Sequence, residues 1–312
     1  LTYHIRNPRL RHEGSRAFSC SGRYPWQGYG GAAHRPKGVM LSHRNILSNT
    51  TGCLDAVTGV DETDSFLSFL PLSHTFERSV GYYSAMTIGA QTIYARGIPE
   101  LGEDLVSQRP TLMVCVPRIF ERIYAKVQEG LPAGSLKRKL FEKAVDIGWK
   151  RFIQQSSPWE ARLWPLLDRL VAHKLRARLG GRIRFLVVGA AALAPQHART
   201  FIGLGLPILQ GYGLTEFSPV ISANRPGDND PLSVGRPLEG VEIRTLADGE
   251  LLARGPSLMM GYWNNPEATA ATIDPDGWIH TGDLVRIKDG RIYITGRAKD
   301  IIVLSNGEKV PP

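Results

Sequence analysis

Cysteine is scarce in this chain of 312 residues, and its three cysteines, Cys20, Cys53 and Cys115, stand far apart. Their spacing forms no CxxC pair for a metal ion, and three residues cannot build the disulfide framework of a small secreted domain. Because scattered thiols favour a reducing compartment, we expect a cytoplasmic protein. Apolar residues make up 42% of the chain, enough for a core of about two packing units, which excludes a disordered protein.

Long hydrophobic runs are also missing. No apolar stretch reaches the roughly 18 residues that a membrane-spanning helix needs, and neither a basic nor an apolar leader segment follows Leu1. The GxxxxGK[ST] motif is absent, and Gly203-Leu204-Gly205 does not open a GxGxxG motif. The sequence therefore predicts no transmembrane helix, no secretion signal and neither of these two nucleotide-binding loops.

Positive charge is in excess, with a formal net charge of +9, but it is confined to two segments. Residues 1–40 hold seven Lys or Arg and one Glu, and residues 136–184 hold thirteen Lys or Arg and four Asp or Glu. The rest of the chain is acidic overall. A nucleic-acid-binding domain would also show aromatic residues on its basic face or a recognisable reading motif, and neither is present. The charge therefore does not indicate a nucleic-acid partner.

The chain changes character at about residue 35. Residues 1–34 are rich in Arg, Gly, Ser and His without periodic apolar spacing, which predicts a disordered or foreign segment. Beyond them, a helical pattern over 118–128 and other helical stretches separate β-type runs, at Phe66–Leu70, Ala90–Tyr94, Thr111–Val116, Arg184–Val188 and Pro207–Gln210. This alternation predicts an α/β fold over residues 35–235, with a mainly parallel sheet and flanking helices.

The pattern after Gly235 consists of short strands separated by turns, namely Val241–Thr245, Glu250–Arg254, Leu284–Lys288 and Arg291–Thr295. The pair Asp289-Gly290 between the last two predicts a hairpin, since these residues adopt the positive φ angles of a tight turn. We expect residues 236–296 to form a small β-rich subdomain, followed by a final segment over 297–312.

Residues 136–184 show an amphipathic helical pattern. Five apolar residues recur at helical spacing, namely Leu163, Leu167, Leu170, Val171 and Leu175, and five cations surround them, namely Arg162, Arg169, Lys174, Arg176 and Arg178. The face could meet a membrane surface or an acidic partner. Alternatively, the leucines pack on the core and the cations are only solvated. The pattern alone allows both interpretations.

The segment Gln210–Glu216 carries groups suited to a nucleotide. Glycines allow a close approach of the backbone to a ligand, the ring of Tyr212 can stack on a base, and the Thr215 hydroxyl can reach a phosphate. The Glu216 carboxylate can hold Mg²⁺. The alternative is a plain strand-to-helix turn in which Thr215 caps the helix.

Two later segments carry charged groups. In Trp278–Asp283, we expect Asp283 at a turn, where its carboxylate could accept two hydrogen bonds from a ribose diol. A turn aspartate usually caps only its own backbone, which is the alternative. The segment Gly296–Asp300 contains Arg297 and Lys299, and its alternative interpretation is a solvated charge cluster.

These three segments, together with Arg35–His43 and Leu70–Glu77, resemble the adenylate-forming (AMP-binding) superfamily, most closely the long-chain fatty acyl-CoA synthetases. The resemblance covers about residue 35 to the end. It implies an acid-thiol ligase in fatty acid metabolism. The fatty acid attacks the α-phosphate of ATP to give acyl-AMP and pyrophosphate, and the thiol of CoA then displaces AMP.

The resemblance also implies roles for single residues. Tyr212, between Gly211 and Gly213, stacks on adenine, Thr215 contacts the phosphate, and Glu216 binds Mg²⁺. The adenine is further lined by the backbone of Gly189, Ala190 and Ala191.

Four further residues complete the implied site. Asp283 and Arg297 hold the ribose hydroxyls, and His74 borders the acyl and phosphate site unless it is an ordinary buried histidine. Lys37 belongs with Thr215, Glu216 and His74 to the implied catalytic set, and Lys299 marks the hinge.

The sequence departs from the family pattern at both ends. Residues 27–34 replace the Thr- and Ser-rich phosphate loop and lack its hydroxyl donors. The chain stops at Pro312, before the family's C-terminal domain and its lysine. We therefore expect weak or no activity from this chain alone. The alternative is a non-catalytic fragment or pseudoenzyme that binds a nucleotide or a membrane surface.

Overall fold

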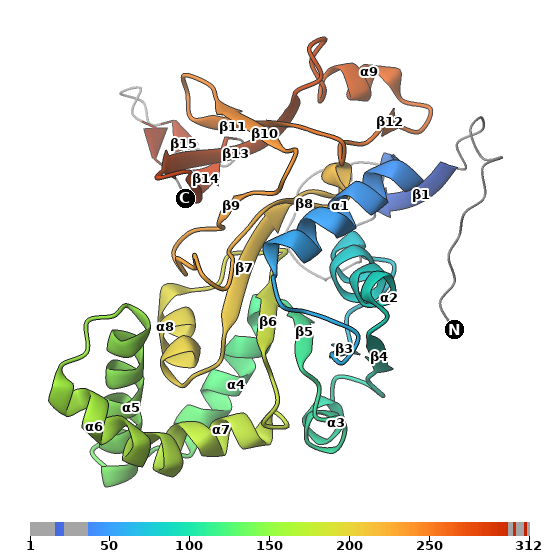
Figure 1. The fold of residues 1–312 in the computed structure, drawn as a ribbon. Helices are drawn as coiled ribbons and strands as arrows, with labels where there is room; N and C mark the ends of the chain where they lie inside the picture. The colour runs from blue at the N-terminus through green and yellow to red at the C-terminus, as the bar shows by residue number, and fades with distance from the viewer. Residues whose placement is uncertain (1–15, 22–36, 299–301, 304–308, 311–312) are drawn as a thin grey trace.

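The computed structural model describes residues 16–21, 37–298, 302–303 and 309–310 (Figure 1). Its centre is a seven-stranded sheet of order β4-β3-β5-β6-β7-β8-β9. The strands are β3 Ser65–Ser68, β4 Gln91–Tyr94, β5 Leu112–Cys115, β6 Phe185–Val188, β7 Ile208–Gly213, β8 Val220–Ala223 and β9 Arg236–Pro237. Pairing is parallel from β4 to β7 and antiparallel at β8 and β9. The predicted α/β fold with a mainly parallel sheet is confirmed.

Helices cover this sheet, and several of them begin where the sequence provides a start signal. Ser42 and Asn45 form a capping box at the first turn of α1, and Pro117 occupies the first turn of α4, where its missing N–H costs nothing. The helices around the sheet are α1 His43–Ala56, η1 Glu77–Tyr83, α2 Ser84–Ile88, α3 Leu101–Gln108, α4 Pro117–Glu129 and α8 Pro195–Gly203. The expected helix over 118–128 corresponds to α4.

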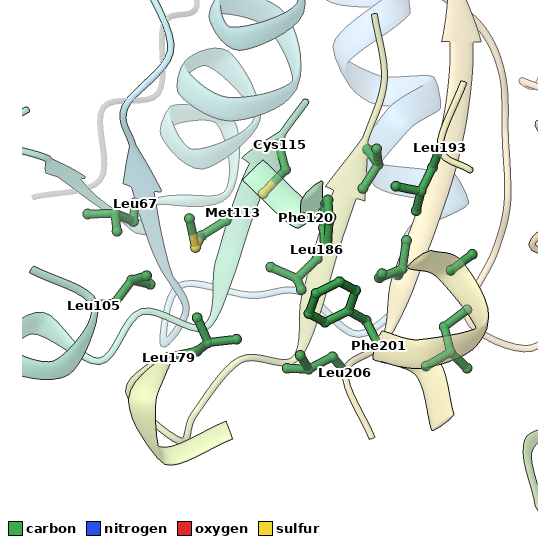
Figure 2. Packing of buried hydrophobic residues seen from close by; sticks show 14 of the residues in the cluster. Leu67, Leu105, Met113, Cys115, Phe120, Leu179, Leu186, Leu193, Phe201 and Leu206 are labelled. Carbon is green, nitrogen blue, oxygen red and sulfur yellow. The ribbon is translucent and has the colours of Figure 1, made fainter. Parts of the chain in front are cut away.

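The main hydrophobic core lies between the parallel strands and α3, α4 and α8 (Figure 2). Met113 of β5 and Leu186 of β6 are 3% and 4% exposed, and Phe120 packs edge-to-face on Phe201 at 5.2 Å. Strands covered on both faces read as continuous apolar runs, which is why the sequence shows them clearly. The carboxyl ends of β3, β5, β6 and β7 meet at one edge, where open α/β sheets bind ligands.

The β-rich part is a four-stranded antiparallel sheet of order β10-β11-β13-β14. Its strands are β10 Glu242–Thr245, β11 Glu250–Arg254, β13 Ile279–Lys288 and β14 Arg291–Arg297. The predicted hairpin is present, with φ angles of 51° at Asp289 and 74° at Gly290. The subdomain boundaries at residues 236 and 296 stay predictions.

The expectation that Asp283 stands at a turn is wrong. Asp283 lies within β13, and its Cα partner on β14 is Arg297. Pairing with β14 keeps Asp283 in the strand. The pairing with β11 is irregular between His280 and Leu284, and Gly282 has a φ of 70°, so a local bend is retained inside the strand.

Short strands extend the fold at both ends of the chain. β1 Arg16–Ser21 and β12 Gly261–Tyr262 flank β2 Lys37–Ser42 in a three-stranded sheet, and β15 Ile302–Val303 pairs with β16 Lys309–Val310. Residues 16–21, which the sequence analysis assigned to a disordered or foreign segment, form a strand through backbone pairing with β2, so the disorder alternative does not describe them and the foreign-segment alternative stays a prediction. The other residues of that segment lie outside the described part. Because β1 lacks the alternation of apolar and polar residues that predicts a strand, the sequence alone does not indicate it.

The basic segment forms α5 Leu136–Phe152, α6 Pro158–Leu167, η2 Asp168–Ala172 and α7 His173–Arg178. Its leucine stripe faces inward. Leu167 is 2% exposed in a cluster against which Leu163, Val171 and Leu175 pack, whereas Leu170 is 41% exposed. The core-packing interpretation therefore holds for four of the five apolar residues. Within the described residues, no helix is both long and apolar enough to cross a bilayer.

Candidate active site

A pocket of about 140 Å³ lies at the carboxyl ends of β6 and β7. It brings together seven of the predicted site residues, namely His74, Gly189, Ala190, Gly211, Tyr212, Gly213 and Thr215. Thr75, Phe76, Leu214, Pro219 and Val220 complete the lining. Residues far apart in the sequence meet here because the parallel strands end at a common edge.

The wall after β6 is shaped by a close contact between Gly189 and Phe76. A Cβ atom at Gly189 would lie 2.7 Å from the Phe76 ring, so this contact requires glycine. Ala190 follows with φ of 67°, in the left-handed region that L residues rarely adopt. The predicted Ala191 lies exposed on the same loop and is not in the pocket lining.

The glycines of β7 serve the pairing with β8 as well as the pocket. A Cβ atom at Gly213 would lie 1.9 Å from the carbonyl oxygen of Pro219, and one at Gly211 would lie 3.2 Å from that of Ser222. Thr215 begins the short 3₁₀ helix η3 Thr215–Phe217, in which no side chain caps the N-terminus. The interpretation of Thr215 as a helix cap is therefore wrong.

Tyr212 links the pocket to the β-rich sheet. Its hydroxyl donates a hydrogen bond of 2.6 Å to Asp283 Oδ2, and Arg297 Nε donates one of 2.9 Å to Asp283 Oδ1. Asp283 is 4% exposed. Burial, reinforced by the Asp283 charge, raises the pKa of the Tyr212 phenol. Asp283 and Arg297 thus do not line the pocket themselves but adjoin it through the Tyr212 side chain.

A second polar group joins Glu216 to Lys37 through Tyr262. The Tyr262 hydroxyl donates a hydrogen bond of 2.8 Å to Glu216 Oε1, and Lys37 Nζ lies 4.6 Å from the centroid of the Tyr262 ring. Burial, together with the Glu216 charge, raises the pKa of the Tyr262 phenol. The sequence analysis missed Tyr262 because one tyrosine in a non-periodic segment gives no signal.

His74 lies in the loop between β3 and η1 and is only partly covered, with much of the residue open to solvent, so its interpretation as an ordinary buried histidine is wrong. The backbone N–H of Phe76 donates to His74 Nδ1 at 3.2 Å. Partial burial lowers the pKa of His74, which favours the neutral ring that can accept this hydrogen bond. The hydroxyls of Thr75 and Thr215 lie 3.5 Å apart and connect this loop to η3.

An apolar cavity of about 40 Å³ adjoins the polar pocket. The two share three lining residues, Phe76, Gly211 and Val220. Side chains of α1, η1 and the sheet supply the remaining walls, among them Cys53, Val57, Val80, Leu112 and Val187. The sequence could not predict this cavity, because each of these residues is of a type that is also expected in an ordinary hydrophobic core.

Glu77, which follows Phe76 in the sequence, is a buried carboxylate in the π-helix η1. It is 1% exposed, and within the described part neither of its oxygens has a hydrogen-bond partner of ordinary geometry. Burial raises the pKa of Glu77 to about 7, although the Ser68 hydroxyl acts in the opposite direction. The sequence analysis quoted Glu77 within a motif but assigned it no role.

The described residues contain no group of three or more His, Cys, Asp or Glu side chains able to hold a metal ion by themselves. A cation at this site would therefore combine Glu216 with oxygens of a bound ligand, an arrangement common for Mg²⁺ on phosphates. The predicted hinge residue, Lys299, lies outside the described residues.

The fold is α/β, and its pocket lies at the carboxyl edge of the parallel sheet, where proteins of this class bind their ligands. The chain belongs to the AMP-binding enzyme family, whose model matches residues 31–263. The resemblance predicted from the motifs is thus confirmed.

Two curated relatives indicate which branch of the AMP-binding enzyme family the chain resembles. The chain is 35% identical over 302 residues to the peroxisomal long-chain acyl-CoA synthetase 6 of Arabidopsis thaliana, covering 90% of this chain and 42% of that protein. It is 35% identical over 292 residues to the long-chain-fatty-acid–CoA ligase FadD15 of Mycobacterium tuberculosis, covering 90% and 48%. The chain spans about half the length of the curated relatives it matches.

Solved structures show the same architecture. ATP-bound MatB from Rhodopseudomonas palustris is 26% identical with a TM-score of 0.66, covering 89% of this chain and 48% of that one. A malonyl-CoA ligase in a ternary product complex with methylmalonyl-CoA and AMP is 27% identical with a TM-score of 0.63, covering 90% and 54%. These likenesses agree with the α/β fold described above.

Proposed function

We propose that this chain carries the nucleotide- and acyl-binding part of an ATP-dependent long-chain fatty acid–CoA ligase. The observation that carries the proposal is the junction of a polar pocket with an apolar cavity, which share Phe76, Gly211 and Val220. An acyl-adenylate has the same two-part chemistry, because a polar nucleotide is joined to a hydrocarbon chain. The long-chain ligases among the relatives support the same substrate class.

The nucleotide end would use the residues gathered around β7. In this proposal, Tyr212 stacks on adenine, and the backbone of 189–191 borders the base. Asp283 and Arg297 bind the ribose hydroxyls, exchanging part of their present hydrogen bonding for bonds to the diol. The hydrogen bond between Tyr212 and Asp283 supports this assignment, because the residue proposed for the base and one of the residues proposed for the ribose are direct neighbours.

The first half-reaction joins a fatty acid carboxylate oxygen to the α-phosphorus of ATP while the bond to pyrophosphate breaks. Negative charge develops on the phosphate oxygens, so fixed donors and cations there lower the barrier. Thr215 and His74 line the pocket and would supply donors, and Lys37 would supply positive charge against the ring of Tyr262, the hydrogen-bond partner of Glu216. In the second half-reaction the CoA sulfur attacks the acyl carbonyl and AMP leaves.

Glu216 is the residue that we assign to Mg²⁺. One carboxylate together with phosphate oxygens is a normal environment for this ion, and Glu216 follows the pocket residue Thr215 directly. When bound, Mg²⁺ would neutralise charge on the phosphates. Tyr262 would then orient the carboxylate through its hydrogen bond to Oε1.

Calorimetric titration with a non-hydrolysable acyl-AMP analogue, beside fatty-acid-dependent pyrophosphate exchange, tests this function. The proposal predicts binding of the analogue that weakens when the acyl chain is removed, because the apolar cavity then stays empty. Binding without exchange would favour the alternative of a non-catalytic nucleotide-binding chain. No binding of the analogue would overturn both.

We place this activity in the cytoplasm, with a peripheral contact to a membrane surface. Cys53 and Cys115 are free and buried, which fits a reducing compartment. Burial raises the pKa of the Cys53 thiol to about 12, so it stays protonated and unreactive.

A further inference from the structure

The outer surface of the helical segment differs from the face that the sequence analysis considered. Trp159, Leu166 and Leu170 are 57%, 54% and 41% exposed. They follow one another at spacings of seven and four residues along the continuous run of α6, η2 and α7, so they share one side. The exposed residues Arg162, Arg169 and His173 lie among them at helical spacing. We call these six residues the outer face.

The outer face carries positive charge without local neutralisation. All four acidic residues of 136–184 are engaged with cations elsewhere, in the pairs Glu142–Arg138, Asp146–Lys150, Glu160–Lys150 and Asp168–Arg176. Within the part of the chain that the structure describes, Arg162 and Arg169 form no salt bridge. Their charge is therefore available to a partner of opposite sign.

The exposed apolar side chains of the outer face indicate which kind of partner this surface binds. Lys143 Nζ lies 5.2 Å from the centroid of the Trp159 ring, which places a cation beside an exposed indole. Tryptophan and arginine favour the boundary between headgroups and acyl chains, because the ring or stem enters the apolar zone and the polar end stays in water. An acidic peptide would pair with the arginines but would leave Leu166 and Leu170 against water.

We propose that the outer face, formed by Trp159, Arg162, Leu166, Arg169, Leu170 and His173, docks onto the surface of a bilayer that contains anionic lipid. The helices lie parallel to the surface, with Trp159, Leu166 and Leu170 entering the headgroup region and the arginines contacting lipid phosphates. Figure 1 shows α6 and α7 at the opposite end of the molecule from β10–β14, so docking leaves the β-rich part uncovered.

Docking deepens the proposed function, because a fatty acid partitions into bilayers and its concentration is highest there. It also stands apart from that function, since vesicle binding requires neither ATP nor catalysis. Co-sedimentation therefore tests the surface, and pyrophosphate exchange tests the chemistry. One can fail while the other succeeds.

The experiment is co-sedimentation of the full chain with phosphatidylcholine vesicles, with and without phosphatidylserine, at low and raised salt. We expect binding that requires phosphatidylserine and falls as salt rises, because exposed charges are screened. Changing Arg162 and Arg169 to Gln should weaken binding about thirty-fold, since each cation contributes about 1 kcal/mol near an anionic surface.

The apolar half is tested separately by a variant with Trp159→Ser, Leu166→Gln and Leu170→Gln. Binding to phosphatidylserine vesicles should fall on the order of ten- to a hundredfold through loss of buried apolar area. Arg176 is left unchanged in all variants, because it pairs with Asp168 and donates to the Leu204 carbonyl.

Two matched controls alter exposed residues elsewhere. Arg122→Gln with Lys126→Gln removes two cations from α4, and Ile98→Gln with Val106→Gln removes two exposed apolar groups near α3. Both should bind vesicles like the parent. Because every altered side chain is exposed, circular dichroism and thermal midpoints should match the parent. Absence of vesicle binding by the parent, or equal binding by all variants, overturns the proposal.

Discussion

Phe76 lies directly against the backbone of Gly189, so closely that a Cβ atom at position 189 would stand 2.7 Å from the ring. Phe76 lines both the polar pocket and the apolar cavity. The contact therefore positions the side chain that lies between the polar pocket and the apolar cavity, which we propose to hold the nucleotide and the acyl chain.

The first prediction concerns Gly189→Ala. The added methyl group must displace the Phe76 ring, so we expect the free energy of unfolding to fall by about 1–3 kcal/mol. Because Phe76 divides the two cavities, affinity for an acyl-AMP analogue should fall by about tenfold or more. Denaturant unfolding and calorimetric titration measure the two effects.

The energetic coupling between Gly189 and Phe76, measured with the double variant, tests the contact more directly than either single variant. Phe76→Leu removes ring atoms that the new methyl group would meet, so the double variant should recover part of the loss. Gly102→Ala is the matched control, since nothing lies within 4 Å of its built Cβ atom. Strictly additive losses in the double variant would contradict this account of the contact.

The second prediction separates the ring of Tyr212 from its hydroxyl. Tyr212→Phe leaves Asp283 Oδ2 without its 2.6 Å partner inside the protein, which should cost about 1–3 kcal/mol of unfolding free energy. The ring remains, so AMP affinity should change by no more than about threefold. Tyr212→Ala should weaken AMP binding on the order of tenfold or more, because stacking on a base contributes about 1–3 kcal/mol.

Tyr94→Phe, at a side chain that is 56% exposed, provides the control for loss of a tyrosine hydroxyl. If Tyr212→Ala binds AMP as tightly as Tyr212→Phe, Tyr212 does not stack on the base. In that case the role of Tyr212 is limited to holding Asp283.

The third prediction assigns the metal dependence of ATP binding to Glu216. Glu216→Gln removes the negative charge but keeps the size of the side chain, so ATP affinity should lose most of its enhancement by Mg²⁺. Titrations with and without Mg²⁺ measure this difference. Glu267→Gln, at an exposed position in α9 Pro266–Ala270, is the control. Equal metal dependence in the parent and Glu216→Gln would remove the assigned role.

The fourth prediction concerns Glu77 and pH. Burial raises the pKa of Glu77 from 4.5 to about 7, so the folded state disfavours the ionised form. Its favourable contribution is complete below about pH 4.5 and is lost as pH rises towards about 7, on the order of 3 kcal/mol in total. Glu77→Gln should lack this decline and should be more stable than the parent at about pH 8.

Denaturant unfolding at several pH values between about 4.5 and 8 measures this effect. Glu239→Gln changes an exposed carboxylate and should retain the parent's decline. A parallel pH dependence in the parent and Glu77→Gln would show that Glu77 does not hold its proton to near neutral pH.

The sequence by itself determined the elements whose signals are local. The run that became β5 is buried on both faces, and the run that became β6 is buried on one face and partly buried on the other, so both read as continuous apolar stretches. Asp289-Gly290 specified its turn because the required positive φ angles belong to those two residues. The motifs around Tyr212 and His74 likewise identified residues that meet in one pocket.

Only the tertiary structure decided which groups meet across the chain. Tyr262 reaches Glu216 from 46 residues away, and Asp283 lies in a strand because Arg297 of β14 pairs with it. Leu170 faces outward while Leu167 is buried, although both belong to the same apolar stripe. The physical reason is common to these cases. Long-range backbone pairing and the shape of the opposing surface determine each environment, and neither is encoded in local spacing.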